Sequence, residues 1–142
     1  PNYFNTVHGI LVDPLTRRVF VNDRGNHRTQ VFDDNGKFLD QWSFGNPSSV
    51  YVTFMSADRH LWAADATTSK IMKYDLDGHF LYSWGTNGDF PGSLFGPHGM
   101  SVDQEGNLYI AEVEAGRVQK FRPRKGANLD FLVGQPVRSA WK

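Results

Sequence analysis

The chain has 142 residues, enough for one ordinary domain with its own hydrophobic core. Its 15 basic residues balance its 15 acidic residues, and this zero net charge argues against a surface built to bind nucleic acid or an anionic membrane. Cysteine is absent, which excludes disulfides, thiolate metal sites and cysteine nucleophiles.

The first stretch of the chain contains four short segments in which apolar residues alternate with polar ones, as half-buried strands do. The strands are expected at 8–13, 18–23, 28–33 and 37–43. The second segment ends at Asp23, an aromatic residue (Phe32) follows nine residues later, and Trp42 comes ten residues after that.

The same spacing returns twice along the chain. Asp65, Tyr74 and Trp84 repeat the pattern 42 residues later, and Glu112 and Phe121 repeat it after a further 47 residues. The strands of these two units are expected at 50–55, 60–65, 70–75, 79–84, 98–103, 107–112, 117–122 and 128–133. The extra residues of the third repeat fall in a glycine-rich connector at 85–97.

Four short antiparallel strands that repeat every ~40–45 residues are typical of a β-propeller blade. Asn35-Gly36 and Asp77-Gly78 supply the positive-φ residues that tight hairpin turns require. The sequence therefore predicts an all-β protein, a single propeller segment over residues 1–142 with blades at 8–44, 50–84 and 98–133.

Three blades do not close a propeller, because closed propellers have ~4–8 blades. We therefore expect either one half of a six-bladed propeller or a homodimer in which two chains complete six blades. The chain starts with Pro1 rather than Met, which indicates processing or truncation. No apolar run approaches the ~18 residues of a membrane span, and no signal-peptide pattern is present, so no membrane partner is expected and the compartment stays open.

The first unit, HGILVDPLTRRVFVNDRGNHRTQVFDDNGKFL, resembles an NHL repeat. The shared pattern is a strand led by His-Gly or Pro-Gly, an acid at the end of the second strand, then Asn-x-Arg-x-x-x-Phe and Asp-x-x-Gly. This resemblance covers the whole chain at the level of its blades, and it implies an NHL propeller, a fold that serves many functions.

The third unit, FGPHGMSVDQEGNLYIAEVEAGRVQKFRPRKGAN, preceded by YSWGTNGDFPG, is similar to the last blade of peptidyl-α-hydroxyglycine α-amidating lyase-like proteins. That resemblance implies a six-bladed propeller with one zinc ion in its channel, held by three histidines from alternate blades. It also implies a substrate with a C-terminal α-hydroxyglycine, which breaks into a peptide amide and glyoxylate.

On this resemblance, His8 and His98 are the expected zinc ligands, because each leads the first strand of its blade. The middle blade carries Val50 at that place, followed by Tyr51. The third histidine and the tyrosine that acts as base in the family would lie on blades outside this chain. Gly99 stands where the family has a calcium-binding aspartate, which argues against calcium here.

Arg24 is the expected substrate-binding residue, since the family places a substrate-contacting arginine just past the acid of this blade. The other two units carry Ala66 and Val113 at that place, so the repeat itself does not require an arginine. Arg24 would hold the substrate carboxylate, and we expect the isolated chain to be inactive as a monomer.

Other interpretations remain open. The chain could be a non-catalytic propeller that binds a peptide or protein on its channel face. Sugar-lactone hydrolysis would need acidic metal ligands in the channel, which the two histidines and Val50 do not offer.

Most of the remaining polar and aromatic residues are expected to serve the blades themselves. The repeated aromatics should pack between blades, the repeated acids should cap turns, and Arg28 should pair with a neighbouring acid or carbonyl. Structural positions in or beside turns are expected for His27, His60 and His79.

Overall fold

The computed structural model describes residues 3–45 and 47–135. These residues form three antiparallel sheets, one for each unit of the repeat. The first sheet contains β1 (Val7–Val12), β2 (Val19–Asp23), β3 (Arg28–Phe32) and β4 (Phe38–Ser43). The second contains β5 (Val50–Met55), β6 (Leu61–Asp65), β7 (Lys70–Tyr74) and β8 (Phe80–Trp84). The third contains β9 (Pro97–Val102), β10 (Leu108–Glu112) and β11 (Arg117–Phe121).

The strands of each sheet follow one another in chain order, as in a propeller blade. All eleven lie within one residue, at each end, of the ranges expected from the alternation of apolar residues. Gly36 and Gly78 have φ values of 83° and 86°, so the predicted Asn-Gly and Asp-Gly turns are confirmed. The all-β propeller prediction is therefore confirmed for three blades.

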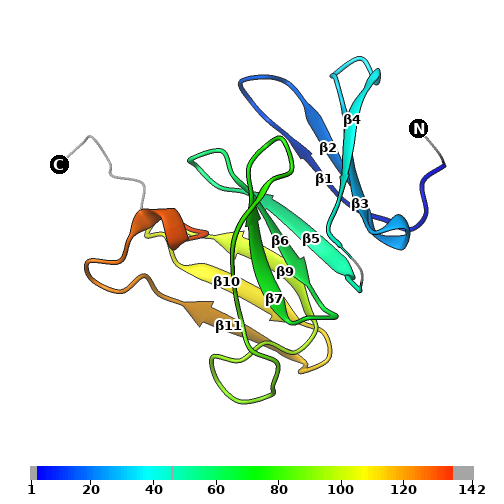
Figure 1. Cartoon of the computed structure of the whole chain (residues 1–142). Helices are drawn as coiled ribbons and strands as arrows, with labels where there is room; N and C mark the ends of the chain where they lie inside the picture. The colour runs from blue at the N-terminus through cyan, green and yellow to red at the C-terminus, as the bar shows by residue number, and fades with distance from the viewer. Residues whose placement is uncertain (1–2, 46, 136–142) are drawn as a thin grey trace.

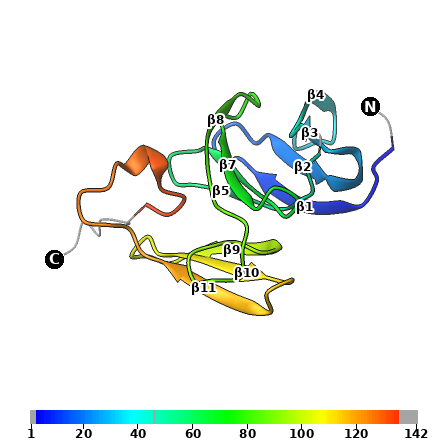
Figure 2. The same cartoon turned by 60° about the horizontal axis from the view of Figure 1, so that its bottom comes forward.

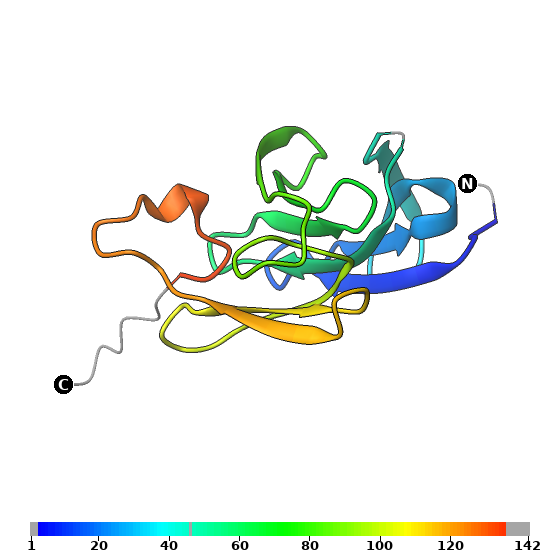
Figure 3. The same cartoon turned by 90° about the horizontal axis from the view of Figure 1, so that it is seen from below.

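The three blades are arranged with the second between the first and the third (Figures 1 and 3). The first strands of the blades are neighbours, because β1 contacts β5 and β5 contacts β9. In Figure 2 the last strands, β4, β8 and β11, lie away from this junction, and the third sheet forms a layer separate from the first two. We call the side formed by β1, β5 and β9 the channel face.

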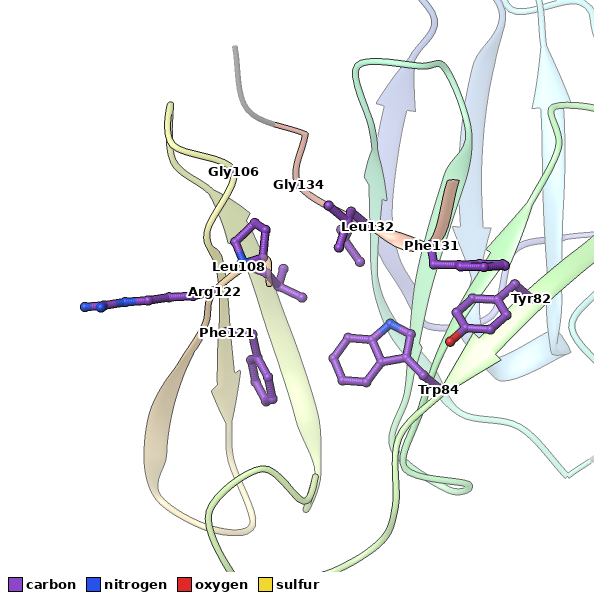
Figure 4. A pocket seen from close by; sticks show the side chains of 11 residues that line it. Tyr82, Trp84, Gly106, Leu108, Phe121, Arg122, Phe131, Leu132 and Gly134 are labelled. Carbon is purple, nitrogen blue, oxygen red and sulfur yellow. The ribbon is translucent and has the colours of Figure 1, made fainter. Parts of the chain in front are cut away.

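Tryptophans from the last strand of one blade hold the next blade in place. The Trp42 ring stacks on Tyr74 of the second blade with centroids 5.2 Å apart. The Trp84 ring meets Phe121 of the third blade edge-on at 5.4 Å, and both lie at the junction shown in Figure 4. The prediction that the repeated aromatics pack between blades is confirmed at both junctions.

The acids at the ends of the second strands cap the segments that enter the blades. We call Asp23, Asp65 and Glu112 the cap acids. Each accepts a backbone N–H at 2.7 Å, from Asn5, Ser49 and Phe95 respectively. All three acids are buried, and satisfying a buried N–H in this way avoids the free-energy cost of leaving it unpaired. Their predicted role at turns is confirmed.

The prediction of a fourth strand at 128–133 in the third blade is wrong. This segment forms a short 3₁₀ helix, η2 (Leu129–Phe131), which the Asn128 side chain caps by accepting the N–H of Asp130. The segment folds into the junction between the second and third blades, where Phe131 packs on Tyr82 with ring centroids 4.7 Å apart (Figure 4). Lys73 donates to the Asp130 carbonyl at 2.7 Å and ties the segment to the second blade.

Burial explains this departure from the repeat. Val133 is 4% exposed in its position between the blades, packed in the cluster that contains Trp62 and Leu108. A strand beside β11 would remove these side chains from that junction. Among the described residues, no helix is long and apolar enough to cross a membrane.

Candidate functional site on the channel face

Each first strand contains a β-bulge near its beginning. In β1 the pairing with β2 is broken between Val7 and Gly9, so His8 has no partner in the ladder. The same irregularity leaves Tyr51 unpaired in β5 and His98 unpaired in β9. A bulge re-aims its side chain, and bulges are common beside active sites. We call His8, Tyr51 and His98 the bulge residues.

The structure corrects the position assigned to the middle blade. Val50 pairs with Asp65 as Val7 pairs with Asp23, so Val50 is equivalent to Val7 and not to His8. Val50 is 2% exposed and belongs to the core between the first and second blades. Tyr51 is therefore the residue of the middle blade that is equivalent to the two histidines.

The three bulge residues meet on the channel face. The His8 and His98 ring centroids are 5.5 Å apart with an interplanar angle of 76°. Tyr51 lies against both rings, with its centroid 4.4 Å from that of His98 and 5.2 Å from that of His8. All three side chains are half-buried, so one side of the cluster stays open to solvent.

Arg24 joins this cluster from the short 3₁₀ turn η1 (Arg24–Asn26), which directly follows the cap acid of the first blade. Its guanidinium carbon lies 4.6 Å from the Tyr51 ring centroid, a cation–π contact. Within residues 3–45 and 47–135, no hydrogen bond or ion pair engages the Arg24 side chain. A half-buried guanidinium with free donors is suited to a carboxylate, which it can bind in a bidentate manner.

The surroundings favour the neutral form of His8. Burial lowers the pKa of His8 below its ordinary value of 6.5, and the positive charge of Arg24 lowers it further. His98 acts in the same direction, while a hydrogen bond with the Tyr51 backbone opposes them. A neutral imidazole has a free lone pair, which is the form that binds a metal ion.

The two histidines fit part of a metal site. Imidazoles that share one tetrahedral zinc through bonds of about 2.0–2.1 Å have ring centroids roughly 5 Å apart, close to the separation of His8 and His98. In the described part of the chain, no group of three His, Cys, Asp or Glu side chains could hold a metal ion. Any further ligand would have to come from outside these residues.

The remaining histidines and Arg28 lie in structural contacts, in agreement with expectation. The exposed His27 has its Nδ1 atom 2.6 Å from the Ser48 carbonyl. The Nδ1 atoms of His60 and His79 lie 2.9 Å and 2.8 Å from carboxylate oxygens of Asp58 and Asp75. Arg28 donates to Asp23 at 2.8 Å.

Tyr51 is the site residue that the sequence did not reveal. The turn between the first and second strands holds six residues in the first blade but five in the second and third. Counting back from Asp65 by the distance that separates Asp23 from His8 therefore reaches Val50, one residue before Tyr51. Counting with the spacing between His98 and Glu112 would have reached Tyr51.

Residues 52–136 match the SMP-30/gluconolactonase/LRE-like region. The chain belongs to the SMP-30/gluconolactonase/LRE-like family. It is also 32% identical over 134 residues to NHL repeat-containing protein 3 of Mus musculus and 31% identical to that of Homo sapiens. The alignment covers 87% of this chain and 37% of each relative, so the chain spans less than half the length of these relatives.

Solved structures of other proteins share the fold. Virginiamycin B lyase from Staphylococcus aureus superposes with a TM-score of 0.60 at 15% identity, over 82% of this chain and 41% of that one. A catalytically inactive histidine-to-alanine variant of the same lyase with quinupristin gives 0.61 at 16% identity, over 84% and 42%. At these identities the likeness is one of fold. It places this SMP-30/gluconolactonase/LRE-like chain among propeller-type structures about twice its length.

Proposed function

We propose that the channel face is part of a zinc-dependent lyase site that cleaves peptidyl-α-hydroxyglycine to a peptide amide and glyoxylate. The observation that carries the proposal is the open guanidinium of Arg24, held over Tyr51 beside two facing histidines. These residues supply the chemistry that such a substrate needs: a carboxylate-binding group, metal-binding imidazoles and a phenol.

His8 and His98 would hold the zinc, with a third protein ligand from outside the described residues. When bound, zinc supplies Lewis-acid polarisation of the substrate hydroxyl. Arg24 binds the substrate carboxylate through paired N–H donors and so orients the reacting carbon.

Tyr51 is the residue of this chain best placed to move the proton. In its deprotonated form, the Tyr51 phenol oxygen would take the proton of the substrate hydroxyl and return it to the amide nitrogen. The bond between carbon and nitrogen breaks, its electron pair goes to nitrogen, and the hydroxyl carbon becomes the aldehyde carbon of glyoxylate. The two products together contain all the atoms of the substrate. Because the described residues supply only two imidazole ligands, we expect the chain alone to bind zinc weakly and not to turn over.

Zinc competition against a chromophoric chelator tests the metal site. We expect His8→Ala and His98→Ala each to weaken zinc binding by at least about tenfold, since each removes one of two imidazole ligands. His79→Ala is the matched control, because His79 is exposed and pairs with Asp75 away from the cluster. Equal loss in all three variants, or no zinc binding by the wild-type chain, would contradict the site.

A second function is favoured by one observation: only two metal-binding side chains gather on the described channel face. The alternative is a non-catalytic propeller that binds the C-terminal carboxylate of a peptide at Arg24. The two differ in their response to zinc. Binding of a glycine-ended peptide that Arg24→Gln abolishes and zinc leaves unchanged favours the non-catalytic function, whereas zinc-dependent peptide binding favours the lyase.

Lactone hydrolysis, which the word gluconolactonase in the family's name denotes, has less support in these residues. The three bulge positions carry two imidazoles and a phenol, and none carries a carboxylate to bind a metal.

A further inference from the structure

A hollow of about 170 Å³ lies between the second and third blades (Figure 4). Its walls include four aromatic rings, those of Tyr82, Trp84, Phe121 and Phe131. Tyr82 and Trp84 belong to β8 and Phe121 belongs to β11, so these walls come from strands that lie away from the channel face. We call this space the aromatic hollow.

The second junction closes less tightly around its tryptophan than the first. At the first junction, Gly78 lies so close to Trp42 that a Cβ added to the glycine would come within 2.4 Å of the indole. At the second, a Cβ added to Gly126, in the turn after β11, would meet no atom within 4 Å. This turn therefore does not cover Trp84 as Gly78 covers Trp42, and Trp84 lines the aromatic hollow instead.

The segment of residues 129–134, which forms one wall of the aromatic hollow, is held near both of its ends. Lys73 donates to the Asp130 carbonyl at 2.7 Å. At the other end, Gly134 lies so close to the Gly106 carbonyl that an added Cβ would come within 2.5 Å of its oxygen. A wall fixed in this way keeps its shape without a ligand, which lowers the entropy cost of binding one.

Two polar groups line the aromatic hollow and are free to donate. Within residues 3–45 and 47–135, no hydrogen bond engages the Tyr82 hydroxyl or the Trp84 indole N–H. In Figure 4 the indole nitrogen points toward Leu132, and the Tyr82 oxygen points toward Trp84. A carbonyl oxygen has two lone pairs and can accept from both donors.

Charge and size limit what the aromatic hollow can take. Arg122 is the one charged residue among the described residues that line it, and its exposed side chain points away from the hollow (Figure 4). An ionised ligand is therefore disfavoured, because desolvation of an unpaired charge is costly. Apolar cavities of about 150 Å³ take up benzene. A hollow of this size thus admits one six-membered ring with a small substituent.

We propose that the aromatic hollow binds a small, neutral aromatic molecule with one ring and one carbonyl group. The ring packs on Trp84 and Phe121, and the carbonyl oxygen accepts from the Trp84 indole N–H and the Tyr82 hydroxyl. Apolar walls with a few converging polar groups are typical of small-molecule sites. The site is separate from the channel face, so it depends on neither zinc nor Arg24.

Titration of the ¹⁵N-labelled chain with acetophenone and with toluene, followed by NMR, tests the proposal. Both probes carry one benzene ring, and only acetophenone has a carbonyl. Each should bind with a dissociation constant on the order of 1 mM, since ligands with so few atoms bind weakly. Acetophenone alone should move the Trp84 indole N–H resonance downfield, because it alone can accept a hydrogen bond from this group. Trp84→Phe identifies the resonance by removing it.

Variants of the lining residues separate the two parts of the site. Tyr82→Phe removes the hydroxyl and keeps the ring, so it should weaken acetophenone binding about fivefold, the effect of one hydrogen bond, and leave toluene binding unchanged. Tyr51→Phe is the matched control, because it removes a phenol on the channel face. Leu132→Trp fills the hollow and should abolish binding of both probes, while the circular dichroism melting curve confirms that this variant folds.

Three results would overturn the proposal. The first is that neither probe binds the wild-type chain up to its solubility limit. The second is that Tyr82→Phe weakens both probes equally, or neither of them. The third is that Tyr51→Phe weakens acetophenone binding as much as Tyr82→Phe does, because the probe would then occupy the channel face.

Discussion

Two sets of equivalent positions lie at the same end of the three blades, and they behave in opposite ways. The cap acids are chemically alike in every blade, and each accepts one backbone N–H at the same distance. The bulge residues stand beside them, yet they differ in chemistry and contact one another across blades. A side chain that repeats serves the blade, whereas one that varies on the common frame is free to serve a ligand.

The largest expected effect comes from a cap acid. Asp65 is 1% exposed and accepts hydrogen bonds from the Ser49 N–H, the Thr67 N–H and the Thr68 hydroxyl. Asp65→Ala leaves these donors without a partner, so we expect the free energy of unfolding to fall by about 3 kcal/mol. Urea unfolding measures the change. If Asp65→Ala lowered the free energy of unfolding no more than the exposed control His79→Ala, the cap acids would not differ from the bulge residues in their contribution to stability.

A smaller effect is expected from an acid in a turn of the third blade. The Asn107 amide donates to Asp103 at 2.8 Å and holds the pKa of Asp103 at about 2, below its ordinary value of 3.8. A lowered pKa stabilises the fold above pH 3.8, and this stabilisation is lost as the pH falls toward 2.

The measurement is the urea midpoint of wild type and Asp103→Asn at several pH values from 5 to 2. The wild-type midpoint should fall more steeply over the acid part of this range, because only the wild type has this carboxylate to protonate. Parallel curves would show that Asp103 does not couple folding to protonation.

The smallest effect on stability is expected on the channel face. His98 has no partner in the ladder and is only half-buried, so His98→Gln should change the free energy of unfolding by about 0.5 kcal/mol or less. The same unfolding experiment applies. A loss as large as that of Asp65→Ala would mean that the bulge residues are structural, and the proposed site would lose its basis.

The fold could be predicted from the sequence because the blade repeats its own signals. Acid, aromatic and tryptophan return at fixed offsets, and eleven strands follow from alternation alone. The segment at 128–133 could not be predicted in this way. Its residues alternate as a strand would, but burial of Val133 between two blades and the Lys73 bond to Asp130 decide its conformation. Both are tertiary contacts between residues that lie far apart in the sequence.

The candidate site was predictable in part. His8, His98 and Arg24 could be found because they break the repeat, and the structure brings all three to the Tyr51 ring. Tyr51 was hidden by a turn that is one residue longer in the first blade than in the other two. Which residues of a bulged strand pair with the neighbouring strand depends on the position of the extra residue. The alternation of apolar residues does not predict that position.

The bulge at the start of each first strand also bears on how such a protein can change over evolutionary time. The extra residue of a bulge is left unpaired, so its side chain can differ between blades without breaking the strand pairing on either side. His8, Tyr51 and His98 occupy such positions, and the three blades of this chain already carry imidazole or phenol there on the same strand frame. One propeller frame can thereby give rise to descendants with different chemistry in the same place.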